Sequence, residues 1–162
     1  MMTSEVVNDS SVKKSVTVKC SLAHAFEIFT KRIELWWPKE HHIGKSPLEK
    51  VFLEEKDGGR WYERCEDGST CDWGRVLSYQ PPKRVVLAWH LSTQFEFDPD
   101  PNHASRLEVT FHDLGDGKVR VDLLHSELEK HGAGWEAMRT SLAGGWTGIM
   151  ESYAGAASAV AS

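Results

Sequence analysis

The feature that most constrains the fold is one long apolar stripe close to the end of the chain. Apolar residues recur there at steps of three and four, at Trp135, Met138, Leu142, Trp146, Ile149 and Tyr153. This spacing puts them on one face of an α-helix, so the sequence predicts an amphipathic helix that follows Gly134 and runs to about Ala157. A helix with one apolar face has to bury that face against another layer.

Short strand-like runs separated by turn signals predict that layer. One run covers residues 12–19, four more lie between residues 48 and 91, and two more cover residues 106–114 and 118–126. Gly, Asp and Pro punctuate them, for example at Asp57-Gly58-Gly59 and Pro81-Pro82. The sequence therefore predicts an α+β fold, in which a curved antiparallel sheet of about six or seven strands wraps around the C-terminal helix.

A second helical stripe follows the first strand. Ser21 is typical of a helix N-cap, and Leu22, Phe26, Phe29 and Ile33 continue at helical spacing until Pro38 ends the pattern. This segment is either one helix or two short helices in succession.

Length and composition set the class of the protein. A chain of 162 residues, 40 % hydrophobic and 27 % charged, is long enough for one packed core. We expect a single domain over residues 12–157, a disordered polar leader over residues 1–11 and a frayed tail over residues 158–162. A net charge of −5 with dispersed Lys and Arg argues against nucleic acid as a partner. With neither a signal peptide nor a membrane-spanning run, the expected location is cytoplasmic.

The residues that could bind a metal do not have the spacing in the sequence that metal sites require. Cys20, Cys65 and Cys71 have no metal-ligand spacing and suit free thiols. Glu40-His41-His42 and the group Asp98, Asp100 and His103 also lack such spacing. Nucleotide-binding and hydrolase motifs are missing from the sequence. We therefore expect no metal and no cofactor.

The alternation of side chains predicts which residues face the interior. Three-residue turns in the first two hairpins would place Leu53 opposite Glu63, Val51 opposite Cys65, Cys65 opposite Cys71, Glu63 opposite Trp73 and Trp61 opposite Arg75. Glu63 and Arg75 are then diagonal neighbours on the inner face, and we predict an ion pair there. It would be a polar anchor within a pocket, or would neutralise itself at a sheet edge. A register slipped by one residue would turn the pair to water instead.

The last hairpin places one histidine on the apolar face. The same counting pairs Phe111 with Val121, Val109 with Leu123, and Leu107 with His125. His125 is then either an interior histidine with satisfied hydrogen bonds or a catalytic group.

Two adjacent glycines, Gly144-Gly145, lie in the middle of the predicted helix. Each glycine costs about 1 kcal/mol relative to alanine, so the pair indicates a close backbone approach to the sheet or a kink over a cavity.

Several segments together resemble the SRPBCC superfamily. They are Gly58-Gly59-Arg60-Trp61-Tyr62-Glu63, Asp72-Trp73-Gly74-Arg75-Val76, Pro81-Pro82-Lys83-Arg84-Val85, Trp89 and Gly144-Gly145-Trp146. From about Val12 to Tyr153 the chain is similar to bacterial members of the group named for homology to the activator of the Hsp ninety ATPase. The resemblance implies the helix-grip (Bet v-like) fold of START domains and the birch pollen allergen, which encloses a hydrophobic cavity.

The resemblance leaves three functions open, because such relatives include lipid carriers, polyketide cyclases, hormone receptors and co-chaperones. The first is binding of a hydrophobic or aromatic small molecule, lipid-like or polyketide-like, without assured catalysis. The second is a chaperone-interacting module, and the third is a cyclase or aromatase with His125 or Glu63 as general acid or base.

We expect Trp36, Trp37 and residues 95–103 at the cavity mouth. The predicted cavity is lined by Trp61, Glu63, Trp73, Arg75, Leu77, Trp89, Val109, Leu123, His125, Met138, Leu142 and Trp146.

Overall fold

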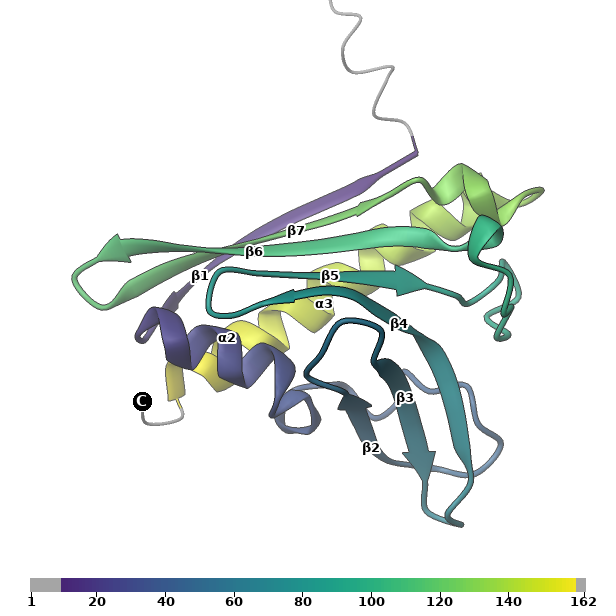
Figure 1. Ribbon diagram of the computed structural model, residues 1–162, viewed down its shortest axis with the longest axis horizontal. Helices are drawn as coiled ribbons and strands as arrows, with labels where there is room; N and C mark the ends of the chain where they lie inside the picture. The colour runs from purple at the N-terminus through teal and green to yellow at the C-terminus, as the bar shows by residue number, and fades with distance from the viewer. Residues whose placement is uncertain (1–9, 160–162) are drawn as a thin grey trace, which may run out of the picture.

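A seven-stranded antiparallel sheet curls around one long helix in the computed structural model, which describes residues 10–159 (Figure 1). The sheet order is β1-β7-β6-β5-β4-β3-β2, so the first two strands of the chain form its two edges. The α+β helix-grip prediction is confirmed. The strands are β1 (Val12–Lys19), β2 (Leu48–Leu53), β3 (Arg60–Cys65), β4 (Thr70–Gln80), β5 (Arg84–Trp89), β6 (Ser105–Gly115) and β7 (Lys118–Ser126).

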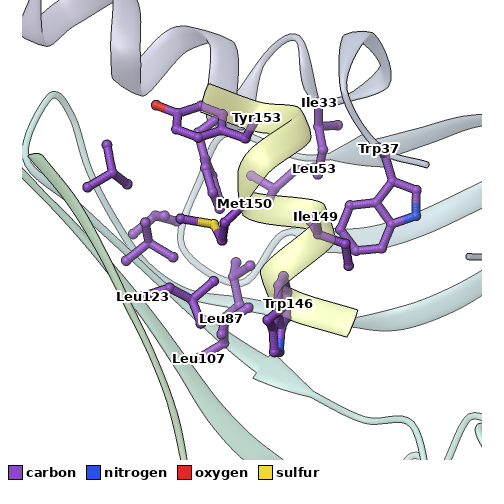
Figure 2. Close-up of a cluster of buried hydrophobic side chains, with 14 of the residues drawn as sticks. Ile33, Trp37, Leu53, Leu87, Leu107, Leu123, Trp146, Ile149, Met150 and Tyr153 are labelled. Atoms are coloured by element: carbon purple, nitrogen blue, oxygen red, sulfur yellow. The ribbon is translucent and has the colours of Figure 1, made fainter. Parts of the chain in front are cut away.

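The long helix α3 (Trp135–Ala159) lies across the concave side of the sheet (Figure 1). The predicted stripe is its buried face, and Figure 2 shows Trp146 and Met150 on the side of Leu87 and Leu123 of the sheet, with Ile149 beside Trp37. Tyr153 Oη donates instead to the Ala25 carbonyl, outside the sheet. Each large apolar side chain that is fully buried contributes about 1.5–3 kcal/mol. The helix is therefore held mainly by this face.

The segment between β1 and β2 carries two short helices, as one of the two alternatives predicted. Helix α2 (Leu22–Thr30) begins at Ser21, whose Oγ accepts a hydrogen bond from the His24 N–H at 3.2 Å. A 3₁₀ turn, η1 (Ile33–Leu35), follows. Two further 3₁₀ turns, η2 (Pro101–His103) and η3 (Leu128–His131), lie in the loops that flank β6 and β7. Helix α2 packs against α3 and so closes one end of the grip.

The predicted register of the last hairpin is confirmed, and that of the first two hairpins is wrong. Leu107 faces His125 and Val109 faces Leu123, as expected. In β2–β3, however, Leu53 faces Trp61 and Val51 faces Glu63, and Cys71 faces Glu63 in place of Cys65. Each turn is centred one residue earlier than predicted, and this shifts the pairing beside it by two positions. A shift of two residues changes partners but keeps every side chain on its face.

A bulge in β4 has a larger consequence, because it moves Arg75 and Leu77 to the outer face. Trp61 pairs with Gly74 while Tyr62 pairs with Asp72, which leaves Trp73 as one extra residue on β4. One extra residue reverses the inside–outside alternation beyond it. Arg75 therefore pairs with Asp72 at 3.1 Å, and Leu77 is 52 % exposed. The predicted ion pair between Glu63 and Arg75 is wrong.

Other expectations concern the chain ends, the thiols and the membrane. The residues expected to form the leader and the tail lie largely outside the described residues, and the domain boundaries stay a prediction. Cys20, Cys65 and Cys71 are free thiols. Within residues 10–159, the model contains no helix with both the length and the apolar character needed to cross a membrane.

Candidate functional site: an aromatic pocket at one end of the grip

A pocket of about 320 Å³ lies where α3, the sheet and the segment before β2 meet. One wall comes from β4 and β5, a second from α3, and the third from residues 37–43, with Phe95 added by the loop after β5. The lining residues are Trp37, Glu40, His41, His42, Ile43, Trp73, Trp89, Phe95, Ser141, Leu142, Gly145, Trp146 and Ile149. The wall is mainly aromatic, and its polar side chains come chiefly from residues 40–42.

The tryptophans of the wall support one another edge to face. Ring centroids are 5.2 Å apart for Trp37 and Trp73, 5.5 Å for Trp73 and Trp89, and 5.9 Å for Trp89 and Trp146. The planes of Trp37 and Trp73 stand at 88°. Such edge-to-face pairs contribute about 0.5–1.5 kcal/mol beyond burial. Trp61 lies behind Trp73 and Trp89 and holds them from the core side. Each of these rings is therefore in contact with at least one other ring of the wall or the core.

The indole N–H groups of three wall residues point to protein acceptors. Trp37 donates to the His41 carbonyl at 2.8 Å, Trp73 donates to Glu63 Oε1 at 2.8 Å, and Trp146 donates to His125 Nδ1 at 3.1 Å. These bonds fix how each ring is turned. Because these N–H groups are bonded within the protein, the wall presents mainly apolar ring surface to the pocket.

Gly145 keeps the helix side of the pocket open. A Cβ at Gly144 or at Gly145 would meet no atom within 4 Å, so the predicted close approach of the backbone to the sheet is wrong for both. Gly145 lines the pocket, whereas Gly144 is exposed. Any side chain at position 145 would project into the space that a ligand needs.

Glu63 anchors the segment that forms the third wall. Its carboxylate is fully buried and accepts hydrogen bonds from the Ile43 N–H at 2.7 Å and the Gly44 N–H at 3.0 Å, besides that of Trp73. The Cys65 thiol donates to it at 3.4 Å. A Cβ on Gly44 would collide with Cys65 Sγ, so this position has no room for a side chain. The carboxylate thus positions residues 40–43.

His125 is the inner member of a hydrogen-bonded chain that reaches the surface. Because the Trp146 indole can only donate, His125 Nδ1 accepts, and His125 Nε2 donates to Ser105 Oγ at 2.7 Å. The Ser105 hydroxyl then donates to His131 Nε2 at 2.7 Å. Burial lowers the pKa of His125 to about 3 and that of His131 to about 4. Both rings are neutral near pH 7, and the chain holds Trp146 in place.

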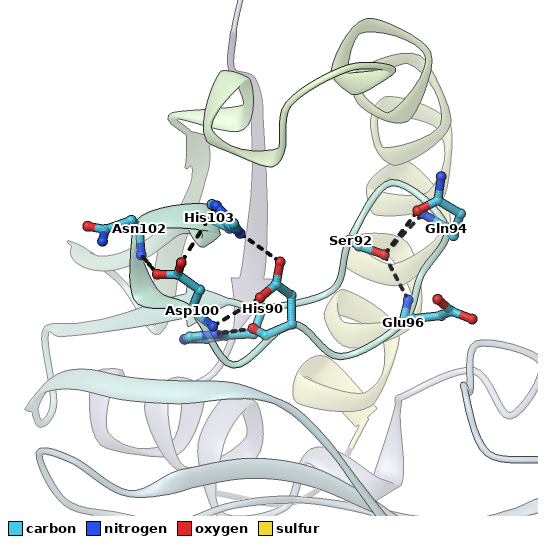
Figure 3. Close-up of polar contacts among 8 residues, drawn as sticks. His90, Ser92, Gln94, Glu96, Asp100, Asn102 and His103 are labelled. Atoms are coloured by element: carbon cyan, nitrogen blue, oxygen red, sulfur yellow. Dashed lines mark hydrogen bonds and ion pairs between the residues drawn. The ribbon is translucent and has the colours of Figure 1, made fainter.

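Polar contacts stabilise the loop that carries Phe95 (Figure 3). Ser92 Oγ accepts from the backbone N–H of Gln94 at 3.2 Å and of Glu96 at 3.3 Å, which closes a tight turn with Phe95 at φ 60°. Further along, Asp98 accepts hydrogen bonds from the Asp100 backbone N–H at 3.0 Å and from His103 Nδ1 at 2.9 Å. The Asp100 N–H and then His103 lower the pKa of Asp98, and the bond to Asp98 raises the pKa of His103. The loop thus delivers one aromatic ring to the pocket.

The structure divides the predicted cavity residues into three groups. Trp73, Trp89, Leu142 and Trp146 line the pocket. A second group is buried behind it or in the core, where Trp61, Glu63, Val109, Leu123, His125 and Met138 lie. Arg75 and Leu77 were wrongly placed inside, and both border a cleft on the outer face. Ligand contact by any of these residues stays a prediction.

The sequence analysis did not assign some of the residues that line the pocket. For two of them, the sequence contained a usable pattern. Trp37 and Phe95 lie at the pocket as expected, whereas Trp36 packs in the core against Phe29 and Tyr153. Gly145 and Ile149 lie three and seven residues after Leu142, so helical spacing alone could have found them. Glu40, His41 and His42 were considered only as metal ligands. Residues 10–159 contain no group of three or more His, Cys, Asp or Glu side chains suited to a metal.

Comparison with known proteins places this geometry in a family. Residues 19–155 match the family model described as activator of Hsp90 ATPase homolog 1-like protein. Among solved structures, the anthrahydroquino-γ-pyrone synthase Txn09 is 37 % identical, with 90 % of this chain and 95 % of that chain covered and a TM-score of 0.65. The self-sacrificing resistance protein CalC from Micromonospora echinospora is 30 % identical, with 93 % and 95 % covered and a TM-score of 0.67.

Matches at lower sequence identity share the fold and carry no information on function. The Aha1 dimer from Colwellia psychrerythraea is 12 % identical, with 92 % of this chain and 96 % of that chain covered and a TM-score of 0.65, which shows the fold alone. No curated protein matches significantly. The family model covers most of the chain, and two relatives reach 30 % identity over nearly their whole length. The chain therefore belongs to the family of activator of Hsp90 ATPase homolog 1-like proteins, within the SRPBCC superfamily.

Proposed function

We propose that the protein binds a planar aromatic small molecule of the polyketide type in the pocket at this end of the grip. The observation that carries the proposal is the wall of four tryptophans and Phe95 around a space of about 320 Å³. Small-molecule sites are typically concave, largely apolar and about 300–1,000 Å³ in volume. This pocket lies at the lower end of that range, so it suits a compact ring system better than an extended acyl chain.

The ring geometry also favours an aromatic occupant. Aromatic rings prefer offset-stacked or edge-to-face contacts at centroid distances of about 4.5–7 Å, and each wall tryptophan already has such a neighbour on one side. A planar ligand that entered the pocket would add an equivalent contact on the open side of each ring. A flexible lipid chain would lose more conformational entropy for the same buried area.

The relative at 37 % identity supports the same ligand class. It is named as an anthrahydroquino-γ-pyrone synthase, whereas the relative at 30 % identity is named as a self-sacrificing resistance protein, without a ligand. The first name describes a fused-ring aromatic product. We take from it the expectation that this pocket also receives a fused aromatic ring system.

The test is a binding screen with planar compounds of one to four fused rings. Tryptophan fluorescence is the readout, because four indoles line the pocket and should be quenched by a stacked ligand. Gly145→Leu fills the pocket from the helix, and Gly148→Leu is the matched control on the exposed side of the same helix. We expect saturable quenching and a ligand-dependent rise in Tm for the native chain and for Gly148→Leu, with at least a tenfold loss of affinity for Gly145→Leu.

Two results would contradict this proposal. One is an absence of saturable quenching across the whole series. The other is equal affinity in Gly145→Leu and Gly148→Leu, which would place the ligand elsewhere.

A second candidate is catalysis on such a ligand, which the identity to a named synthase favours. Glu40, His41 and His42 are titratable side chains at the pocket, whereas His125 and Glu63 are fully buried with their polar atoms in hydrogen bonds. Incubation with the substrate of Txn09, followed by chromatography, tests for turnover. A chaperone partner and a cytoplasmic location stay predictions, and stimulation of a chaperone ATPase by the purified chain would test the former.

A further inference from the structure

His42 differs from the other polar side chains at the pocket because one of its two ring nitrogens is committed. Its Nδ1 lies 3.0 Å from the carbonyl oxygen of Gly44. A carbonyl oxygen can only accept a hydrogen bond, so Nδ1 carries the proton. In the neutral ring, Nε2 then carries a lone pair and can only accept. Within residues 10–159, Nε2 has no hydrogen-bond partner.

The residues behind His42 hold it in this orientation. The Gly44 carbonyl accepts from His42 on one side, and the Gly44 N–H donates to Glu63 Oε2 at 3.0 Å on the other. Glu63 also holds the Ile43 N–H at 2.7 Å. A buried carboxylate therefore holds the backbone N–H of Gly44, and the carbonyl of the same residue orients the imidazole. An orienting hydrogen bond to one ring nitrogen sets the role of the other nitrogen.

The remaining pocket offers few other acceptors at fixed positions. The wall tryptophans supply no acceptor, because an indole N–H can only donate. Glu40 and Ser141 are exposed to water. His41 is half-buried like His42, but within residues 10–159 no hydrogen bond orients its ring. A ligand hydroxyl inside an apolar pocket needs an acceptor, because burying it unpaired costs about 1–3 kcal/mol. His42 Nε2 can supply that acceptor.

We infer that His42 Nε2 accepts a hydrogen bond from a hydroxyl group on the aromatic ligand, so that the ligand is a phenol or an enol. This inference rests on the proposed function and adds to it the polar group that the ligand must carry. His42 is then a specificity-determining residue: it favours hydroxylated ring systems over the same rings without a hydroxyl hydrogen.

The test compares two probes that differ in one hydrogen-bond donor, 2-naphthol and 2-methoxynaphthalene, at pH 8. Affinities are measured by tryptophan quenching for the native chain, His42→Asn, His42→Gln and His112→Asn. The Asn side chain can keep a donor at the Nδ1 position toward Gly44 while it removes the acceptor at Nε2. Gln can place an oxygen near Nε2. His112 lies on the outer face beside Asp122 and is the matched control. The quantity of interest is the ratio of the two affinities, because it cancels the difference in hydration between the probes.

We expect the ratio to favour 2-naphthol about three- to tenfold more in the native chain and in His112→Asn than in His42→Asn. His42→Gln should fall between them, and its result stands even if His42→Asn fails to fold. An equal ratio in the native chain and both His42 variants overturns the inference but leaves the proposed function intact. Failure of both probes to bind the native chain overturns the inference together with the proposed pocket.

Discussion

The two ends of the grip contain similar aromatic residues but different packing. At the closed end, between α2 and the last turns of α3, Phe29 touches Trp36, Phe111 and Tyr153 at centroid distances of 5.0 Å, 5.8 Å and 5.1 Å. Trp36 Nε1 donates to the Ile28 carbonyl and Tyr153 Oη donates to the Ala25 carbonyl, each at 2.8 Å. His24 Nε2 on α2 is the exception, because it is buried with no hydrogen-bond partner within residues 10–159. The rings at this end pack against one another as a core.

The open end, formed by the pocket and the tryptophans around it, is less complete. Trp61 Nε1 and Trp89 Nε1 are buried with no hydrogen-bond partner in the part of the chain that the structure describes. Each such group costs about 1–3 kcal/mol. Gly145 adds the helix-propensity cost of a glycine. The comparison shows that aromatic content alone does not distinguish a core from a site. The distinction comes from unfilled space, because each end holds a buried polar atom without a partner in the described residues.

The largest effect should come from removing one isoleucine from each end. Ile28→Ala at the closed end should destabilise the protein by about 2–5 kcal/mol, because the cavity it leaves is surrounded by packed side chains. Ile149→Ala at the open end should cost about 1–2 kcal/mol less, because its side chain already borders the pocket. Urea unfolding of both variants measures the difference. Equal losses would mean that the open end is packed as tightly as the closed end.

The second prediction separates the ends by pH. Burial holds His125 neutral, with a folded-state pKa of about 3 against 6.5 in the unfolded chain. The unfolded state therefore binds more protons, and stability is lost as the pH falls below about 6.5. Between pH 6 and 5 the loss should be about 1–2 kcal/mol, with a smaller share from the half-buried His131. Urea unfolding at each pH should show this slope reduced in His125→Gln.

The closed end responds to alkali instead. Burial raises the pKa of Tyr153 above its ordinary value of 10, so deprotonation in the unfolded chain should lower stability only above about pH 10. Tyr153→Phe should reduce that alkaline loss and leave the acid slope unchanged. An acid slope that persists in full in His125→Gln would contradict the assignment to the open end.

The third prediction concerns the indole N–H groups. Trp36→Phe and Trp61→Phe remove similar ring volume from buried positions. Trp36→Phe also leaves the Ile28 carbonyl without its partner, whereas Trp61→Phe removes an N–H that has no partner in the described chain. We expect Trp36→Phe to be more destabilising by about 1 kcal/mol. Thermal and urea unfolding compare the two, and a larger loss for Trp61→Phe would show that its N–H is in fact satisfied.

The fold was predictable from the sequence because it follows from periodicity. The stripe from Met138 to Tyr153 and the alternation in β6 and β7 survive any small error in turn length, so the helix, the last hairpin and the interior position of His125 were correct. The β3–β4 register was not, because a bulge adds one residue without changing the local pattern of residue types. Gly74 was the available signal: a Cβ there would collide with the Ala88 carbonyl oxygen. Glycine within a strand often marks a bulge or a close approach.

The site was less predictable than the fold because it depends on a loop. Residues 37–43 carry no periodic pattern, and their position is set by Glu63, which lies twenty residues further along the chain from Ile43. Sequence parity did place Glu63 on the inner face, but its partners are two backbone N–H groups, the Trp73 indole and the Cys65 thiol in place of the expected arginine. Backbone donors are present at nearly every residue, so the sequence does not reveal which of them a buried carboxylate will bind.

The smallest effect, and the sharpest comparison of function with stability, comes from two glycines of α3. Gly145→Ala and Gly148→Ala should each stabilise the helix by up to about 1 kcal/mol, since a Cβ meets no atom within 4 Å at either position. Only Gly145 lines the pocket. Gly145→Ala should therefore raise Tm but weaken binding of a fused-ring ligand, whereas Gly148→Ala should raise Tm and leave binding unchanged. Equal binding by both variants would mean that Gly145 is not kept for the ligand, and the glycine would then need another explanation in the packing of α3.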